Sequence, residues 1–283
     1  MMRGHVLLLV IVTLVGLQMR ASATPILGSA EGFAVLGYST VTNTGSSVIT
    51  GSVGVSPGSA VTGFPPGILA GGGTVHLSDD AARQAQADLA TAYGYLSSLT
   101  ATQDLSGKDL GGLTLTPGVY YFSSDAGLTG TLTLNADNAA DALFVFQIGT
   151  SLATAANSSV FIENAPVGNA PGLYFVVGTS ATLGAGTNFE GNILADQSIS
   201  LNTGASINLG RALAVNGAVT LDTNIVSDGA LTPEPRPGQC LLLGLGLAGT
   251  AALSRRLVAA HSSRAQARTS SPAPTRVQRS QKA

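Results

Sequence analysis

The sequence predicts an all-β solenoid that carries one long α-helix, and two observations lead to the solenoid, while a third, the low charge, bears on its function. Short runs of alternating apolar and polar residues, such as 128–134 and 143–148, are separated by Gly, Asn and Asp, as is typical of short strands joined by turns. In the C-terminal half the pattern repeats about every 18 to 20 residues, a period that fits one solenoid coil of about three strands. Charged residues make up 10% of the chain, where an ordinary soluble domain has roughly a quarter.

Composition excludes several other classes of protein. An apolar content of 45% with so little charge is the opposite of the balance found in disordered chains. The 36 glycines lack a strict triplet period, which excludes a collagen-like chain. Cys240 is the single cysteine, so neither an intrachain disulfide nor a cysteine-based zinc site can form.

Residues 1–23 are predicted to be a signal peptide. Arg3 precedes an apolar run over 6–17, and Ala21-Ser22-Ala23 forms a small-x-small cleavage site. A buried core helix is the alternative interpretation. We therefore expect export, with the mature chain beginning at Thr24.

Residues 78–99 are predicted to form the long helix. Ser78 fits the N-cap position, and Asp79 and Asp80 suit the positive end of a helix. Leu89 and Leu96, with Tyr93 between them, recur near helical spacing and define an apolar face. We expect this helix to cover a face or an edge of a sheet.

The repeats align on four leading leucines. Their spacings are 31, 18 and 20 residues, and the longer first gap contains a Pro/Gly/Asn-rich loop over 164–171. In a solenoid such leucines stack inward, while the residues that follow them form a ladder on an outer face. The leucines are Leu152, Leu183, Leu201 and Leu221.

The predicted ladder consists of small, uncharged side chains. A soluble domain leaves a wide face uncharged mainly where that face contacts something, although Thr, Asn and Gly also suit strands and corners for structural reasons alone. A one-residue slip would reverse which residues point outward. The ladder comprises Thr154, Ala185, Thr203 and Thr223, with Asn157, Asn188 and Ser206 three positions further on.

The C-terminal region differs from the rest of the chain in its charge. Residues 24–232 contain three basic and 14 acidic residues, whereas 233–283 contain eight basic residues and one acidic residue. An acidic body with so few cations argues against nucleic-acid binding. Pro233-Glu234-Pro235, an apolar run over 240–253 and Arg255-Arg256 resemble the PEP-CTERM sorting signal, which implies recognition by a membrane sorting enzyme. The basic tail, 257–283, is predicted to be disordered, and an uncleaved short anchor is the alternative for 233–256.

Residues 24–232 resemble the microbial ice-binding (antifreeze) family of irregular β-solenoids. Phe33-Ala34-Val35-Leu36-Gly37 and the run 49–58 match its opening, and the run 112–120 matches its central signature. The runs 189–195 and 218–221 match its closing coils. The resemblance implies a right-handed β-helix of triangular cross-section with a long helix alongside, and adsorption to ice through one flat face.

The resemblance also implies ice-contacting residues. Some members carry a Thr-Ala/Gly-x-Thr/Asn motif, which Thr154-Ala155-Ala156-Asn157 fits fully and which 185–188 and 203–206 fit with one change each. Ice is then the expected partner, the chain is expected to be a monomer, and neither a cofactor nor a metal ion is predicted. The candidate ice-binding residues are Thr154, Asn157, Ala185, Thr187, Asn188, Thr203, Ala205, Ser206 and Thr223.

Two other function classes remain open at this point. β-Helices also include polysaccharide-cleaving enzymes, but these need paired carboxylates or a base beside a bound cation, and His76 is the one histidine in 24–232. We therefore expect a protein without catalytic activity. A surface adhesin or matrix component, with exopolysaccharide as its partner, is the second alternative.

Overall fold

The computed structural model describes residues 26–139, 141–166 and 171–229. The chain divides into two units, Met1–Ala230 and Leu231–Ala283, and all described residues belong to the first. The predicted signal peptide (1–23), sorting segment (233–256) and basic tail (257–283) lie outside the described residues. Within the described part, no helix is long and apolar enough to cross a membrane.

Across these residues the chain forms three parallel β-sheets, here called A, B and C. Sheet A has the order β7 (Val75–Leu77), β4 (Ser52–Val55), β1 (Phe33–Gly37), β22 (Ala212–Ala214), β19 (Asn192–Ala195), β16 (Gly172–Val177), β13 (Leu143–Ile148), β10 (Gly118–Phe122) and β8 (Gln103–Asp104). Sheet B has the order β11 (Ala126–Leu128), β14 (Leu152–Thr154), β17 (Ala181–Leu183), β20 (Ile199–Leu201), β23 (Val219–Asp222), β2 (Thr40–Thr44) and β5 (Ala60–Thr62). Sheet C has the order β6 (Ile68–Ala70), β3 (Val48–Thr50), β24 (Ile225–Ser227), β21 (Ser206–Asn208), β18 (Asn188–Glu190), β15 (Ser159–Glu163), β12 (Thr131–Asn135) and β9 (Thr114–Leu115).

Successive strands visit the three sheets in turn. After β13 in sheet A the chain enters β14 in sheet B and β15 in sheet C, and the next coil repeats this path through β16, β17 and β18. Each coil pairs in parallel with its neighbours, and the arrangement confirms the predicted β-solenoid. Short strands suffice because every backbone group that points along the solenoid axis meets the next coil.

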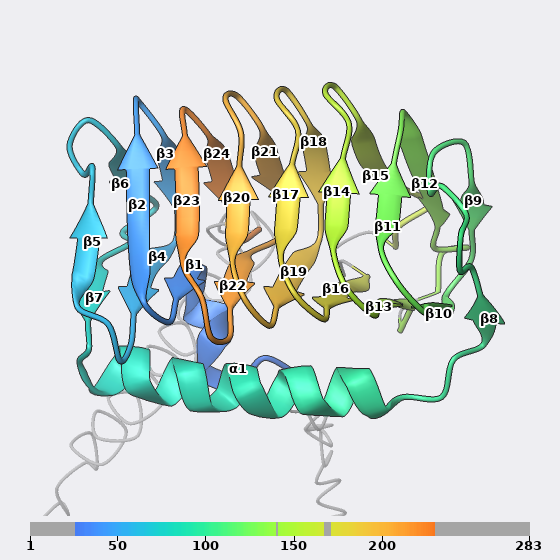
Figure 1. Ribbon diagram of the computed structural model, residues 1–283, viewed down its shortest axis with the longest axis horizontal. Helices are drawn as coiled ribbons and strands as arrows, with labels where there is room; N and C mark the ends of the chain where they lie inside the picture. The colour runs from blue at the N-terminus through green and yellow to red at the C-terminus, as the bar shows by residue number, and fades with distance from the viewer. Residues whose placement is uncertain (1–25, 140, 167–170, 230–283) are drawn as a thin grey trace, which may run out of the picture. The chain divides into compact units, whose positions relative to one another are not determined.

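The order of coils along the axis does not follow the order of the chain. The first coil, β1 to β3, lies between the second coil and the last one, since the order in sheet A is β4-β1-β22-β19. After β7 the chain runs through α1 (Asp80–Ser98) to the opposite end and returns coil by coil. Figure 1 shows this path, with the blue first coil beside the orange last coil and α1 extending along the solenoid. The N-terminal and C-terminal parts of the domain therefore meet within each sheet.

The N-cap of the helix lies one residue later than predicted. Asp79, not Ser78, is the N-cap residue, and its carboxylate accepts a hydrogen bond from the Ala82 amide at 2.9 Å. The Ser78 backbone instead has a positive φ of 49°, and its hydroxyl donates to the Pro57 and Gly58 carbonyls. An aspartate also complements the partial positive charge of the helix N-terminus.

The helix packs on the outward side of sheet A, as its apolar spacing predicts. Leu89 and Leu96 are fully buried, and Tyr93 is partly buried against the same cluster. On sheet A the cluster includes Val145, Tyr174, Val176, Leu194 and Leu213, one or two from each strand it crosses. Covering these residues removes their apolar surface from water.

A second core fills the inside of the solenoid. Tyr120, Phe146 and Phe175 are register partners on neighbouring strands of sheet A, and their rings stack with centroids 5.2 and 4.5 Å apart. Phe189 from sheet C closes the row at 4.7 Å from Phe175. Because this core lies between all three sheets, it holds their outer faces rigidly relative to one another.

Candidate functional site

Sheet B presents a face of small side chains to the outside. In most of its strands an outward-pointing residue has an inward-pointing residue on each side, whereas in β5 the middle residue Val61 packs toward the core and Thr62 points outward. In β23, for example, Thr220 is exposed while Val219 and Leu221 are buried. The same alternation recurs in β14, β17 and β20.

The outward residues form one aligned row across the sheet. Strand pairing places each of them directly beside the next, and β-strands lie about 4.7–4.9 Å apart. The row runs Gly127, Ala153, Thr182, Ser200, Thr220, Thr42 and Thr62. Its last five members, Thr182, Ser200, Thr220, Thr42 and Thr62, are here called the hydroxyl row.

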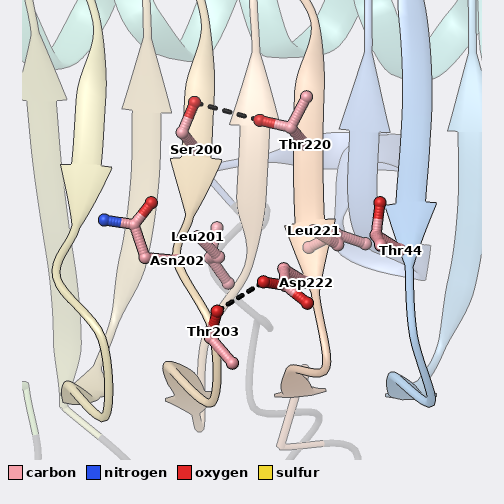
Figure 2. Close-up of a pocket in the computed structure, with 8 residues that line it drawn as sticks. All are labelled: Thr44, Ser200, Leu201, Asn202, Thr203, Thr220, Leu221 and Asp222. Carbon is pink, nitrogen blue, oxygen red and sulfur yellow. Dashed lines mark hydrogen bonds between the residues drawn. The ribbon is translucent and has the colours of Figure 1, made fainter.

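A shallow hollow lies on this face beside the hydroxyl row. Figure 2 shows Thr44, Asn202 and Asp222 around it, together with the hydrogen bond from Thr220 to the Ser200 hydroxyl at 3.0 Å. The Thr203 hydroxyl donates to the Asp222 carboxylate at its margin. The lining combines hydroxyl, amide and carboxylate groups with the side chains of Leu201 and Leu221.

Charge is nearly absent from this face. Within the described part of the chain, Asp222 is the one charged residue in the strands of sheet B. None of the described large apolar side chains that are exposed belongs to these strands. Sheet C differs, since it exposes Phe161, Ile225 and Ile68 to about half of their surface or more and carries Glu163 and Glu190.

The nine sequence-predicted residues lie at the turn between sheets B and C and do not share one flat face. Four are exposed at the turn: Asn157, Ala185, Thr203 and Thr223. Asn188 and Ser206 begin strands of sheet C, where they are register partners. The remaining three, Thr154, Thr187 and Ala205, are buried.

The buried threonines stabilise the turn from inside. The Thr154 hydroxyl accepts from the Gly184 amide at 2.8 Å and lies 2.8 Å from the Thr187 hydroxyl. Thr187 also donates to the Ala155 carbonyl at 3.3 Å. The expectation that Thr154 belongs to the outer face is therefore wrong, because its side chain satisfies backbone groups that are removed from water.

A two-residue difference in register explains this displacement. Leu152 pairs with Ala181 rather than with Leu183, whereas the predicted pairing of Leu183 with Leu201 is confirmed. In sheet C, Ser159 rather than Asn157 pairs with Asn188. A shift of two residues keeps the inward leucine inward, so alternation alone could not reveal it.

The hydroxyl row is not among the residues predicted from the sequence, although the sequence contains a signal for three of its members. Thr182, Ser200 and Thr220 directly precede the leading leucines, in the segments Ala181-Thr182-Leu183, Ile199-Ser200-Leu201 and Val219-Thr220-Leu221. An apolar residue on both sides marks the middle one as outward. No repeat relates these segments to Thr42 and Thr62, which enter the row through pairing of distant coils.

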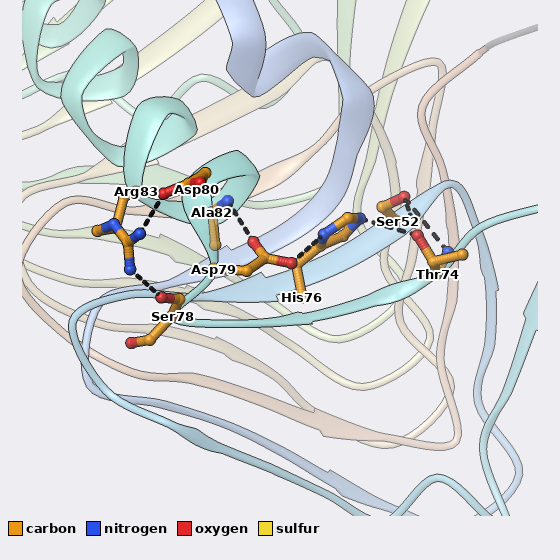
Figure 3. A network of polar contacts seen from close by, with 8 residues as sticks. All are labelled: Ser52, Thr74, His76, Ser78, Asp79, Asp80, Ala82 and Arg83. Atoms are coloured by element: carbon orange, nitrogen blue, oxygen red, sulfur yellow. Dashed lines mark hydrogen bonds and ion pairs between the residues drawn. The ribbon is translucent and has the colours of Figure 1, made fainter.

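His76 belongs to a separate polar network at the start of the helix. Figure 3 shows its ring between Thr74 and Asp79, with Nε2 2.8 Å from the Thr74 hydroxyl and Nδ1 2.8 Å from the Asp79 carboxylate. The amide of Ala82 and the histidine ring both bind Asp79, and this hydrogen bonding lowers the pKa of its carboxyl group. The network joins β7 to α1. Among the described residues, no group of three or more His, Cys, Asp or Glu side chains could hold a metal ion.

Comparisons with known proteins agree with this architecture. The family model described as Ice-binding-like matches residues 35–227. An ice-binding protein of Nostoc sp. (strain HG1) is 55% identical over 255 residues, which are 87% of this chain and 93% of that protein. An ice-binding protein of Flavobacterium frigoris (strain PS1) is 34% identical, over 71% of this chain and 75% of its own length.

Solved structures give the same result. The crystal structure of an ice-binding protein from an Antarctic biological consortium has a TM-score of 0.67 and 43% identity, covering 72% of this chain and 91% of its own. That of the ice-binding protein from the Antarctic ascomycete Antarctomyces psychrotrophicus has a TM-score of 0.66 and 41% identity, covering 71% and 96%. The family model spans most of the chain, and the chain therefore belongs to the ice-binding-like family.

Proposed function

We propose that this protein adsorbs to ice through the outward face of sheet B and thereby inhibits ice growth and recrystallisation. The observation that carries the proposal is the aligned row of small, mostly hydroxyl side chains on a sheet face that holds one charge. Family membership and the names of the relatives support it. The exposed turn residues Ala185, Thr203 and Thr223 follow strands that carry the hydroxyl row, and we propose that they contribute at the margin of this face.

The mechanism follows from what ice offers. Ice is an uncharged lattice of hydrogen-bonded water, and a charged side chain would keep its own hydration shell instead of joining that lattice. A threonine hydroxyl both donates and accepts hydrogen bonds, while its methyl group forms no hydrogen bonds with the surrounding water. Waters held by such a row at strand spacing can merge with the ice surface.

Rigidity contributes to the same end. The row stands on strands that are paired on both sides, except at the edge strand β5, and the core beneath it is closely packed. A binding surface that is ordered beforehand loses little conformational entropy on adsorption. The regular spacing is therefore available before ice is encountered.

The experiment is the growth of a single ice crystal in the purified protein on a cooling stage, with thermal hysteresis as readout. We expect faceted crystals and a gap between melting and freezing. Round crystals without a gap, in protein shown by circular dichroism to be folded, would refute ice binding. The adhesin or matrix function would then take its place, with binding to exopolysaccharide as the next assay.

We also propose that the solenoid is right-handed and triangular in cross-section, and that the protein has no catalytic activity. A right-handed coil of triangular cross-section is supported by three sheets around one core. A non-enzymatic role is supported by membership in the family. We further propose a monomer, which sedimentation equilibrium would test against a dimer.

Export and sorting are proposals that rest on the sequence. We propose that residues 1–23 direct secretion and that 233–256 are read by a membrane sorting enzyme, which leaves the protein outside the cell or at its surface. Mass spectrometry of the protein recovered from its natural host would test both. Mature ends near Thr24 and near Pro233 are expected, and an intact N-terminus or C-terminus would refute the corresponding step.

A further inference from the structure

We infer that ice contact is confined to the five of the seven strands of sheet B that carry the hydroxyl row, here called the hydroxyl part of the sheet. This inference rests on the proposed ice-binding function and localises it. The row places five hydroxyl side chains on five successive strands, β17, β20, β23, β2 and β5. At the usual strand spacing it extends over about 19 Å.

The two remaining strands of the sheet, β14 and β11, lack these features. Their row positions are Ala153 and Gly127, which have no hydroxyl group to hold a water. Beyond Gly127 the row ends at Asp109, which is bridged to it. The Asp109 carboxylate accepts from the Gly111 amide at 2.7 Å and from the Thr129 amide at 2.9 Å. Asp109 is exposed at the row position itself and ends the uncharged part of the row. Asp222, in contrast, is two residues from the row position Thr220, at the margin of the hollow.

The hollow lies in the hydroxyl part of the sheet and is lined by further polar groups beside the row. Thr44 and Asn202 stand beside the row positions Thr42 and Ser200 and line the hollow with their hydroxyl and amide groups. Its volume of about 350 Å³ holds on the order of ten waters at the density of the liquid. Because Ser200 and Thr220 of the row also line the hollow, we expect waters held there to join those over the row.

Two segments that are far apart in the sequence form the hydroxyl part of the sheet together. Thr220 of the last coil is the register partner of Thr42 in the first coil, and four residue pairs join β23 to β2. The adjacent coils contribute Ser200 and Thr182 on one side and Thr62 on the other. The contact surface is thus centred on the junction of the first and last coils.

The test compares bulky substitutions at matched positions of the full chain. Thr220→Tyr and Thr42→Tyr lie in the hydroxyl row. Ala153→Tyr lies outside it, at the aligned position on the neighbouring strand β14, and Thr131→Tyr is a control on sheet C. All four residues point outward and are exposed, and tyrosine is well tolerated in strands. Thermal hysteresis is measured at equal concentration, and unfolding temperatures establish that each variant is folded.

We expect Thr220→Tyr and Thr42→Tyr to reduce hysteresis by about tenfold, since a ring standing above the row displaces the ordered waters of its neighbours. Ala153→Tyr and Thr131→Tyr should retain at least about half of the activity, because they cover no part of that water layer. Thr182→Tyr replaces either row variant that does not fold.

Four other outcomes would overturn the inference. An equal loss in Ala153→Tyr means that the whole of sheet B contacts ice, which leaves the proposed function intact. Unchanged activity in both row variants moves the ice contact away from sheet B. A loss confined to Thr131→Tyr places it on sheet C. Absence of hysteresis in the unmodified protein removes the proposed function itself.

Discussion

Sheets B and C are built by the same coils, yet their outer faces differ most where the first and last coils meet. There, sheet B shows Thr220, Thr42 and Thr62 in register. One strand further along the same coils, sheet C shows Ile225, Val48 and Ile68 in register. All six are β-branched, so strand propensity accounts for both rows. It does not account for hydroxyl groups on one side and methyl groups on the other, and this difference points to a functional demand on sheet B.

The strongest predicted loss of stability comes from a substitution in the core that supports both sheets. Phe146→Ala deletes a fully buried ring from the stacked aromatic row and should destabilise the protein by about 3–5 kcal/mol. Phe161→Ala, at a side chain 51% exposed on sheet C, should cost far less. Chemical denaturation measures both. Equal costs would show that the interior row does not dominate the stability of the solenoid.

A lysine introduced on sheet B can be compared with a lysine introduced on sheet C in the same coil. Thr182→Lys on sheet B should reduce thermal hysteresis by about tenfold, because a strongly hydrated ammonium group disturbs the ordered waters. Asn188→Lys on sheet C should leave most of the activity. Asn188 is among the sequence-predicted ice-binding residues, so a larger loss there than at Thr182 would favour that prediction over the sheet B face.

Thr154 separates stability from activity. Thr154→Val keeps the shape but leaves the buried Gly184 amide without its acceptor, at a cost of about 1–3 kcal/mol. Hysteresis measured well below the unfolding temperature should not change. Reduced activity in a variant that is still fully folded would return Thr154 to the ice-contacting set.

Glu190 on sheet C gives the stability of the protein a pH dependence. Burial raises the pKa of its carboxyl group, although the hydrogen bond from the Ile162 amide acts in the opposite direction. The folded state therefore holds this proton more tightly than the unfolded state. Stability is favoured below the ordinary carboxyl pKa and is lost as pH rises through the raised pKa.

Glu190→Gln should consequently raise the unfolding temperature at neutral pH and remove this part of the pH dependence. The oxygen of the new amide can still accept from Ile162. Thermal unfolding from pH 4 to pH 8 provides the measurement, with Glu163→Gln on the same sheet as control. A variant that is less stable at neutral pH would contradict the expected sign.

The smallest effect concerns the single charge on sheet B. Asp222→Asn keeps an oxygen that can accept from Thr203 and removes a strongly hydrated carboxylate from the margin of the hollow. We expect a modest rise in hysteresis, by less than about twofold, since one boundary charge affects few of the bridging waters. A clear fall would show that the carboxylate itself orders waters of the contact surface.

Local sequence patterns were sufficient to predict the class of fold and the long helix. The inward leucines, the coil period and the apolar helix face are local patterns, and each reflects burial of alternate or periodic side chains. The scarcity of charge also followed from composition. The N-cap of the helix differed by one residue, since Ser78 and Asp79 both have capping side chains and only the backbone conformation chooses between them.

Tertiary structure alone decided where the candidate site lies. Register between coils is set by backbone pairing and turn length, which local alternation does not encode, so Leu152 was aligned two residues away from its true partner. The interior of the turn also needs polar groups, which drew Thr154 and Thr187 inward. Above all, Thr42 and Thr220 are neighbours because the last coil pairs with the first, and a contact between such distant segments leaves no periodic trace in the sequence.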